Sequence, residues 1–231
     1  MVVWVFAGGG ESEIKGLILF LRKIFNSYQF ERKTPINNKK APNPKKALGK
    51  TGKSLADQII WQLNNSLINN EKCDLILVLD DLDCRDVGQQ KQLFLKAINS
   101  VNGASEIKQI IAFAAPELES WIVADWQNTF AKHIDFRGFH EGMRHWLSTK
   151  NFPFDAPESF SEYDSDKDSC KEKLSELIIE AVSEKAQKRY LKASHTPFLL
   201  QQVNPENVAE KCPLFREFYL TFNNLFKSES S

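Results

Sequence analysis

The sequence predicts an α/β protein with a doubly wound, mainly parallel sheet and a helical C-terminal addition. Short, continuously apolar runs bounded by glycines or acids are typical of buried parallel strands. They alternate with segments whose apolar residues recur at helical spacing, as far as about residue 130. We therefore expect an α/β core at 1–130 and a helical region at 131–231 that packs on it.

The expected elements of the core follow one another in regular alternation. Strands are predicted at 2–7, 28–32, 75–79 and 107–115. Helices are predicted at 14–25, at 54–67, at 87–101 and from Pro116 onward, where a proline and acids in the first turn are typical of a helix start. Beyond the core, 151–170 should be a surface loop, and helices are expected at about 170–190 and 206–227.

Composition excludes several classes of protein. Thirty basic and 30 acidic residues give no net charge, so overall charge indicates no partner. The four cysteines lie far apart without metal-ligand spacing, which predicts reduced thiols in a cytoplasmic protein, with neither a disulfide framework nor a zinc site. No apolar run approaches the ~20 residues that span a bilayer, so we expect no contact with a membrane.

A basic loop is predicted at 32–53, where eight Lys or Arg residues occur without an acid. Such a loop suits contact with the phosphate backbone of a nucleic acid, although many basic loops are only solvated. Its cations are Arg32, Lys33, Lys39, Lys40, Lys45, Lys46, Lys50 and Lys53.

Within this loop, KKALGKTGKS (45–54) fits a relaxed phosphate-loop signature. A working phosphate loop follows a buried strand, but the preceding NKKAPNPKK is rich in proline and lysine. The alternative is that Ser54 merely caps the next helix. A dinucleotide fingerprint beginning at Gly8 also fails, because its last position is Glu13.

The strongest chemical signal is LILVLDDLDC (75–84), an apolar strand that ends in Asp80, Asp81 and Asp83. Ligands bind at the carboxyl ends of strands in such sheets. On an extended backbone Asp81 and Asp83 would point to the same side, and such a pair suits Mg²⁺ or Mn²⁺. The alternative is that these acids cap a helix or face solvent.

Four short motifs, taken in order, resemble a known fold family. They are VFAGGGESE, LVLDDLDC, PELESWIVAD and YLKASHTP. Together they resemble the TOPRIM (Rossmannoid) fold of topoisomerases, primases and OLD-type nucleases. More narrowly, they resemble a TOPRIM-like family often encoded beside ATPases in bacterial phage-defence loci. The resemblance extends from residue 2 to about residue 197.

The resemblance implies roles for particular residues. Asp81 and Asp83 would be the paired metal ligands, and Glu119 would be a possible further ligand. Asp125 and Trp121 belong to the same motif as Glu119, and Trp121 is expected to pack in the core. The implied cofactor is Mg²⁺ or Mn²⁺.

The resemblance also implies that Lys192 and His195 approach the scissile phosphate; for His195 the alternative is a surface loop. The family usually carries a catalytic glutamate where this chain has Ala7. Alanine cannot transfer a proton. Either Glu11 or Glu13 therefore acts in its place, or the protein is naturally inactive, or the chain is a disabled variant of an active nuclease.

Together with the resemblance, these residues predict a metal-dependent nuclease that cleaves phosphodiester bonds of DNA, tRNA or another RNA. The resemblance implies that it is the effector of an anti-phage defence system, with an AAA- or ABC-type ATPase as its partner. The alternative is a catalytically inactive interaction module that binds or restrains the ATPase, for which Ala7 is the main support.

Overall fold

A four-stranded parallel sheet forms the centre of the N-terminal part of the computed structural model, which describes residues 1–34 and 51–229. Its strands are β1 (Val2–Ala7), β2 (Gln29–Arg32), β3 (Leu75–Asp81) and β4 (Lys108–Ala114), in the order β2-β1-β3-β4. The sequence prediction of an α/β protein with a parallel sheet is confirmed. The arrangement is Rossmann-like.

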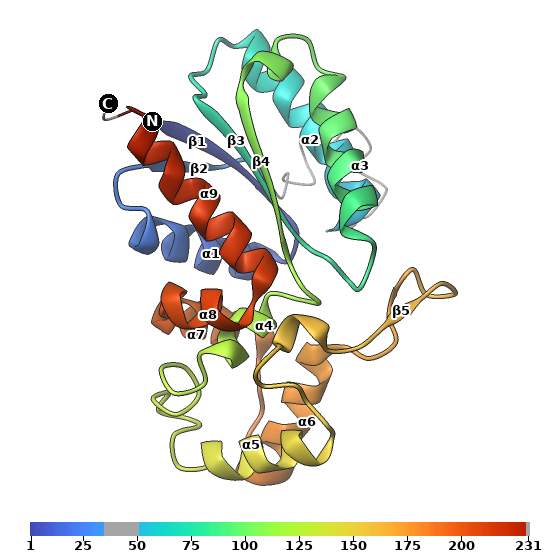
Figure 1. The fold of residues 1–231 in the computed structure, drawn as a ribbon, viewed down its shortest axis with the longest axis vertical. Coiled ribbons are helices and arrows are strands. Elements are labelled where there is room, and N and C mark those ends of the chain that lie inside the picture. The colour runs from blue at the N-terminus through green and yellow to red at the C-terminus, as the bar shows by residue number, and fades with distance from the viewer. Residues whose placement is uncertain (35–50, 230–231) are drawn as a thin grey trace. The chain divides into compact units, whose positions relative to one another are not determined.

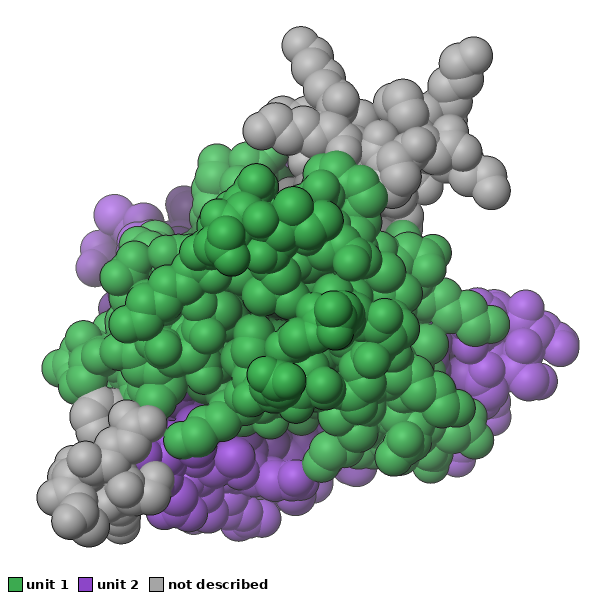
Figure 2. All heavy atoms as spheres, turned by 90° about the horizontal axis from the view of Figure 1, so that it is seen from above, with its two compact units in different colours: residues 1–81, 86–113 green, residues 82–85, 114–231 purple. Residues whose placement is uncertain are grey.

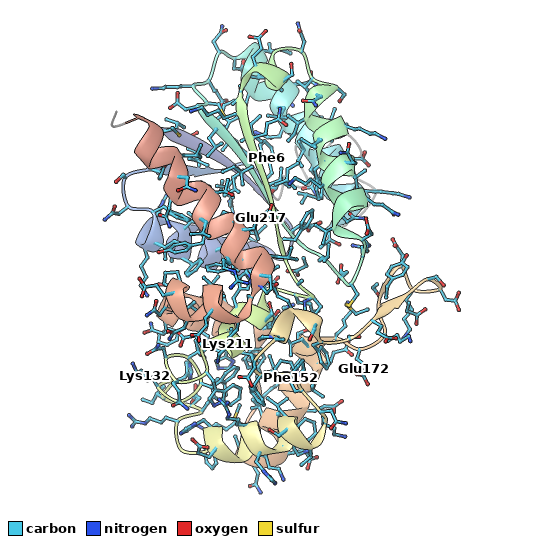
Figure 3. The ribbon with its side chains drawn as sticks, in the orientation of Figure 1. Phe6, Lys132, Phe152, Glu172, Lys211 and Glu217 are labelled. Atoms are coloured by element: carbon cyan, nitrogen blue, oxygen red, sulfur yellow. A yellow bond between two sulfur atoms is a disulfide. The ribbon has the colours of Figure 1, made fainter. Side chains whose placement is uncertain are left out.

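Three helices cover this sheet: α1 (Glu11–Ile24), α2 (Gly52–Ile68) and α3 (Val87–Asn99). Across the sheet, the chain moves from β1 to β2 in one direction. It then crosses back over β1 to β3 and continues in that direction to β4. Right-handed crossovers therefore place α1 on one face and α2 and α3 together on the opposite face (Figure 1). Fully buried aromatic residues such as Phe6, labelled in Figure 3, fill the space between the layers.

The register of β1 and β3 fixes which residues meet at the edge of the sheet. Val3 pairs with Leu75 and Ala7 pairs with Leu79. The Gly8 N–H then donates to the Leu79 carbonyl at 2.9 Å. The glycine turn after β1 and the acidic end of β3 therefore lie at the same edge, as the sequence predicts.

The C-terminal part is mainly helical. Its elements are α4 (Glu119–Ala124), α5 (His140–Thr149), α6 (Leu174–Ala186), α7 (Lys192–Gln202), α8 (Pro205–Lys211) and α9 (Pro213–Glu229), with the short hairpin β5 (Tyr163–Asp164) and β6 (Ser169–Cys170). Sequence patterns missed α5 and α7 and merged α8 with α9. These last two are separate because Pro213 lacks an N–H and begins a new helix. The hairpin lies within the predicted loop at 151–170.

The chain forms two compact units, residues 1–81 with 86–113 and residues 82–85 with 114–231 (Figure 2). The sequence suggested a boundary at residue 130 instead. The structure places it earlier because α4 packs against α6, α7 and α8 of the second unit. Lys211, labelled in Figure 3, adds a hydrogen bond from its Nζ to the carbonyl of Ala124 at the end of α4.

Aromatic side chains form the centre of the second unit. Trp121 is fully buried, with the ring of Phe215 edge-on at 4.8 Å and the ring of Phe218 stacked at 6.4 Å. Trp126 stacks on Phe130 at 4.5 Å. The expectation that Trp121 is a core residue is confirmed.

The prediction of four reduced cysteines is wrong for one pair. Cys84 and Cys170 form a disulfide across 86 residues of sequence, whereas Cys73 and Cys212 are free. The spacing of cysteines along the chain cannot reveal a pair that only the fold brings together. In the part of the chain that the structure describes, no helix is long and apolar enough to cross a membrane.

We expect Trp121→Ala to lower the free energy of unfolding by about 3–5 kcal/mol, because it leaves a cavity beside two aromatic rings. Chemical denaturation followed by circular dichroism measures this loss. Trp146→Ala is the matched control. Because Trp146 is only half-buried, this substitution should lower the free energy of unfolding much less. Equal losses for the two variants would contradict the central position of Trp121.

Candidate functional site

Asp80, the first acid of the DDLD stretch, caps a helix. It is 1% exposed, and its Oδ2 accepts the N–H of Gly52 at 2.8 Å. Gly52 begins α2 with φ +57°, a conformation that suits glycine. The carboxylate thus occupies the positive end of α2, where a phosphate loop would hold its phosphate. This geometry disfavours nucleotide binding at 45–54, although residues 45–50 lie outside the described residues.

Only part of the basic loop can be assessed. Lys39, Lys40, Lys45, Lys46 and Lys50 lie outside the described residues. Lys53 is exposed and remains a candidate for contact with nucleic acid.

The first two cations of the loop have partners within the first unit. The Lys33 side chain is 8% exposed, pairs with Glu31 and Glu71, and lies 4.2 Å from the ring centroid of Trp4. Arg32 pairs with Glu11 at 3.6 Å. Lys33 is therefore a structural cation, contrary to its predicted role in nucleic-acid binding.

The glycine turn carries two acids with different surroundings. Glu13 Oε2 accepts the Gly10 N–H at 2.6 Å and so caps α1. Glu11 is exposed and pairs with Lys15 at 3.3 Å, and hydrogen bonding by Lys15 is the main cause that lowers the pKa of Glu11. Of the two, Glu11 is the carboxylate that solvent or substrate can reach.

Ala7, at the position of the family's glutamate, is 2% exposed. Its N–H donates to Thr34 Oγ1 at 2.7 Å, and that hydroxyl donates to the Ala7 carbonyl at 2.9 Å. A longer side chain at position 7 would therefore begin in a buried environment.

Asp83 does not continue the strand. β3 ends at Asp81, and Asp83 has φ +50°, so the two residues do not lie on one extended strand and the expected same-side orientation is not established for this pair. The turn is fixed in the second unit by hydrogen bonds from Leu82 N–H to the Ala114 carbonyl at 2.8 Å and from Asp83 N–H to the Pro116 carbonyl at 2.9 Å. The position of the Asp83 backbone is thus set by the last residue of β4 and by Pro116.

The Asp83 carboxylate is only partly solvated. Its side chain is 13% exposed, and Oδ2 lies 3.2 Å from a guanidinium nitrogen of Arg85. Burial raises the pKa of this carboxyl, and the positive charges of Arg85, Lys173 and Lys192 offset part of the effect. Partly desolvated carboxylates of this kind gain from a bound cation.

Glu119 is fully buried and has partners at both oxygens. Thr196 donates its hydroxyl to Oε1 at 2.9 Å, and Lys192 Nζ lies 3.3 Å from Oε2. The Thr196 hydroxyl also contacts the Tyr190 hydroxyl at 2.8 Å. A lysine ammonium therefore neutralises Glu119 where the sequence predicted a metal ion. Sequence reasoning selected both Glu119 and Lys192 but not their pairing.

We call Asp83, Arg85, Glu117, Glu119, Lys173 and Lys192 the acid–lysine cluster. Its members come from the turn after β3, from α4 and the segment before it, and from the starts of α6 and α7. Glu117 caps α6 by accepting the Ser175 N–H at 2.8 Å and hydroxyl at 3.2 Å. The cluster thus combines carboxylates with cations that can neutralise a phosphate.

Asp125 has a structural role. It is 3% exposed and accepts hydrogen bonds from Asn128, from the Asn204 N–H and from Asn207. These contacts hold the start of α8.

His195 also lies on α7, and its ring contacts His133 and Asp135. The ring centroids of His133 and His195 are 5.4 Å apart, and His195 Nε2 lies 3.7 Å from Asp135 Oδ2. Burial, and then the neighbouring His195, lowers the pKa of His133. His195 and Lys192, predicted to act together at the scissile phosphate, therefore have different partners: Asp135 for His195 and Glu119 for Lys192.

His133, Asp135 and His195 lie close enough together to hold a metal ion. Among the described residues, no other group of three or more His, Cys, Asp or Glu side chains does so. The hydrogen bonds argue otherwise. Nδ1 of His133 accepts the Asp135 N–H at 3.1 Å, and Nδ1 of His195 accepts the Leu191 N–H at 2.7 Å. Each neutral ring then carries its proton on Nε2. A metal ion that bound Nδ1 would have to displace the backbone N–H, and one that bound Nε2 would have to displace the proton. We place no metal at this group.

Comparison with models of protein families assigns the chain to a family. A model described as a domain of unknown function (DUF4276) matches residues 10–223. The chain belongs to this family. Comparisons with curated proteins and with solved structures gave no significant match. The family description names no activity.

Lys192→Met should lower the free energy of unfolding by about 3–5 kcal/mol, because it leaves the Glu119 carboxylate buried without its cation. Adding Glu119→Gln should recover much of this loss. Urea denaturation of both single variants and the double variant gives the coupling free energy. Lys188→Met is the control: Lys188 pairs with the exposed Asp135, and surface pairs contribute about 0–1 kcal/mol. Additive losses at positions 119 and 192 would rule out the pair.

Asp83 predicts a pH dependence of stability. Its native pKa lies above the unfolded value of about 3.9, so the folded protein binds more protons than the unfolded chain. The contribution of Asp83 to stability then falls as the pH rises through the native pKa. We expect Asp83→Asn to gain stability relative to wild type as the pH rises from about 4 through the native pKa of Asp83, as measured by denaturation without divalent cations. Asp155→Asn, at an exposed site, should show no such trend, and a pH-independent difference for Asp83→Asn would refute the prediction.

Proposed function

We propose that the protein is a metal-dependent nuclease of TOPRIM-like fold. The observation that carries this proposal is the position of the acids at the carboxyl end of β3, a central strand whose register places it beside the glycine turn of β1. This edge is where open parallel sheets bind their ligands. The acid–lysine cluster, which contains Asp83, supports the same proposal.

Asp81 and Asp83 are the residues that would hold Mg²⁺ or Mn²⁺. Only Leu82 separates them, so the chain itself keeps their Cα atoms within about 7.6 Å. Their carboxylates are the hard oxygen donors that these ions prefer, and the raised pKa of Asp83 fits a group that gains from a cation. Glu119 does not fit as a further ligand while Lys192 and Thr196 occupy its oxygens. When bound, the ion would supply Lewis-acid stabilisation of charge on the phosphate.

The residues of the chain contribute the rest of the chemistry. Lys192, held by Glu119, can donate to a non-bridging phosphate oxygen and neutralise charge in the transition state. Arg85 is bound to Asp83 and orients its carboxylate. Position 7 cannot supply a general base, so the exposed Glu11 is the candidate. Lys53, with the lysines that precede it in the sequence, would contact the nucleic-acid backbone.

The substrate would be DNA, tRNA or another RNA, and the activity would serve an anti-phage defence system under the control of an AAA- or ABC-type ATPase. These parts of the proposal rest on the resemblance of the four sequence motifs alone. Phosphodiester cleavage also depends on that resemblance, and the carboxylates and cations of the acid–lysine cluster support it.

Cleavage of plasmid DNA and of total tRNA, each with Mg²⁺ or Mn²⁺, tests the proposal. We expect activity that chelation abolishes and that Asp81→Asn or Asp83→Asn lowers by at least about 100-fold, the scale expected when a group that stabilises transition-state charge is lost. Asp155→Asn is the matched control, because this acid is exposed in the second unit. Lys192→Met should lose activity, measured where it remains folded.

The same assays include Ala7→Glu, alone and with Asp81→Asn. Activity that appears only with Ala7→Glu and disappears in the double variant would identify position 7 as the missing catalytic group. Cleavage that persists without divalent cations, or in Asp83→Asn at full rate, would refute the metal site.

An inactive interaction module is the second candidate. Ala7 favours it, because this buried position carries no acid or base. Absence of cleavage and of Mn²⁺ binding in both the wild type and Ala7→Glu, together with binding to the candidate ATPase, would support this alternative.

A further inference from the structure

The turn that carries Asp83 adopts an unusual backbone conformation. Asp83 has φ +50° and Cys84 has φ +60°, so two consecutive residues other than glycine are left-handed. Left-handed conformations cost about 1–2 kcal/mol per residue, and aspartate tolerates them better than most side chains do. The turn therefore depends on outside restraints to keep its shape.

Those restraints join the turn to the β5–β6 hairpin of the same unit. Cys84 is bonded covalently to Cys170 in β6. Arg85 donates from Nε to Asp168 Oδ1 at 3.3 Å and from a terminal nitrogen to the Asp168 carbonyl at 2.6 Å. The Tyr163 hydroxyl in β5 donates to Asp168 Oδ1 at 2.9 Å. The turn is thus held at Cys84 and Arg85, in addition to the backbone hydrogen bonds of Leu82 and Asp83 to Ala114 and Pro116.

The disulfide is the covalent restraint on the residues after Asp83, whereas the hydrogen bonds from Leu82 and Asp83 to Ala114 and Pro116 hold the start of the turn. Each strand of the hairpin has two residues, with Tyr163 opposite Cys170 and Asp164 opposite Ser169, and such a hairpin is marginally stable by itself. The contacts of Asp168 are exposed, so each contributes little. Without the covalent bond, Cys84 and Arg85 can leave their positions, although the backbone hydrogen bonds of Leu82 and Asp83 to Ala114 and Pro116 remain. Arg85 is hydrogen-bonded to the Asp83 carboxylate and then moves that carboxylate with it.

We propose that the Cys84–Cys170 disulfide is a redox switch that sets the divalent-cation affinity of Asp83. The oxidised protein holds the carboxylate in the conformation that binds the ion. The reduced protein populates that conformation only in part, so its apparent affinity falls by the fraction lost. This inference rests on the proposed metal site.

The reductant is a dithiol. One of its thiolates attacks the sulfur of Cys84, which is half-buried, whereas Cys170 is 3% exposed. The sulfur–sulfur bond breaks, Cys170 leaves as a thiolate and takes a proton, and a mixed disulfide joins Cys84 to the reductant. The second thiolate of the reductant then releases Cys84. Two electrons and two protons pass to the protein, and the reductant becomes a disulfide.

Cys73 is the matched control for this chemistry. It is a free cysteine in the first unit, and burial raises its pKa to about 11. The thiolate is the form that exchanges, so Cys73 reacts slowly. Cys73→Ser should keep the disulfide and the redox response.

The test compares the oxidised full chain, the full chain reduced by a dithiol that is then removed without oxygen, and Cys84→Ser with Cys170→Ser. Alkylation followed by mass spectrometry counts the free thiols in each sample. Titration with Mn²⁺, followed by the paramagnetic resonance of the free ion, gives the dissociation constant. Amide hydrogen exchange reports the protection of Leu82 and Asp83, whose N–H groups are bonded to Ala114 and Pro116.

We expect the reduced protein and the double variant to bind Mn²⁺ at least about fivefold more weakly than the oxidised protein, within the ~5–150-fold range of coupled sites. The two amides should also exchange faster. Cys73→Ser should match the oxidised wild type in both measurements.

Three results would overturn the switch: four alkylated cysteines in protein kept under oxidising conditions, equal amide protection in both redox forms, or equal Mn²⁺ affinity in both forms. Absence of Mn²⁺ binding in every sample would refute the metal site itself. If reduction still loosened the two amides in that case, the failure would belong to the proposed function, and redox control of the turn would stand.

Discussion

The pairing of β1 with β3 is the constraint on which the arrangement of the acids depends. Both strands are buried, and their register places Ala7 beside Leu79. Because the strands are parallel, the glycine turn and the acidic segment leave the sheet at the same edge. A shift of one residue would turn the apolar side chains of β3 to the opposite faces and move Asp81 relative to the turn. The hydrophobic core therefore fixes the position of the first acids of the candidate site.

Neighbouring acids in one stretch have different physical roles. Asp80 is buried and caps α2, whereas Asp83 is partly solvated and bound to Arg85. Glu119, further along, is neutralised by Lys192. A buried carboxylate requires a partner that offsets its loss of water, and each of these three acids has a partner of a different kind. The chemistry of each acid follows from that partner more than from its place in a motif.

The sequence predicted the sheet and its helices because local patterns determine them. Apolar runs and helical spacing identified all four strands of the sheet and the helices between them. Some predictions failed because the deciding contact joins residues far apart in the chain, and others because of a local feature of the backbone. Thr196 and Glu119 are separated by 77 positions and the two bonded cysteines by 86. The helix α7 was missed because Pro197 lies inside it. The orientation predicted for Asp83 assumed that the strand continues, whereas β3 ends at Asp81 and Asp83 lies in a left-handed turn.

The assignment of the four residues 82–85 to the second unit has a topological consequence. These residues belong to the second unit, although the chain on both sides of them belongs to the first. Neither unit is therefore a continuous piece of chain that could be expressed alone by truncation. The bond between Cys84 and Cys170 also spans the junction at residues 113 and 114. A protease that cut the chain at this junction would not release two fragments from the oxidised protein, since the halves would stay joined through sulfur.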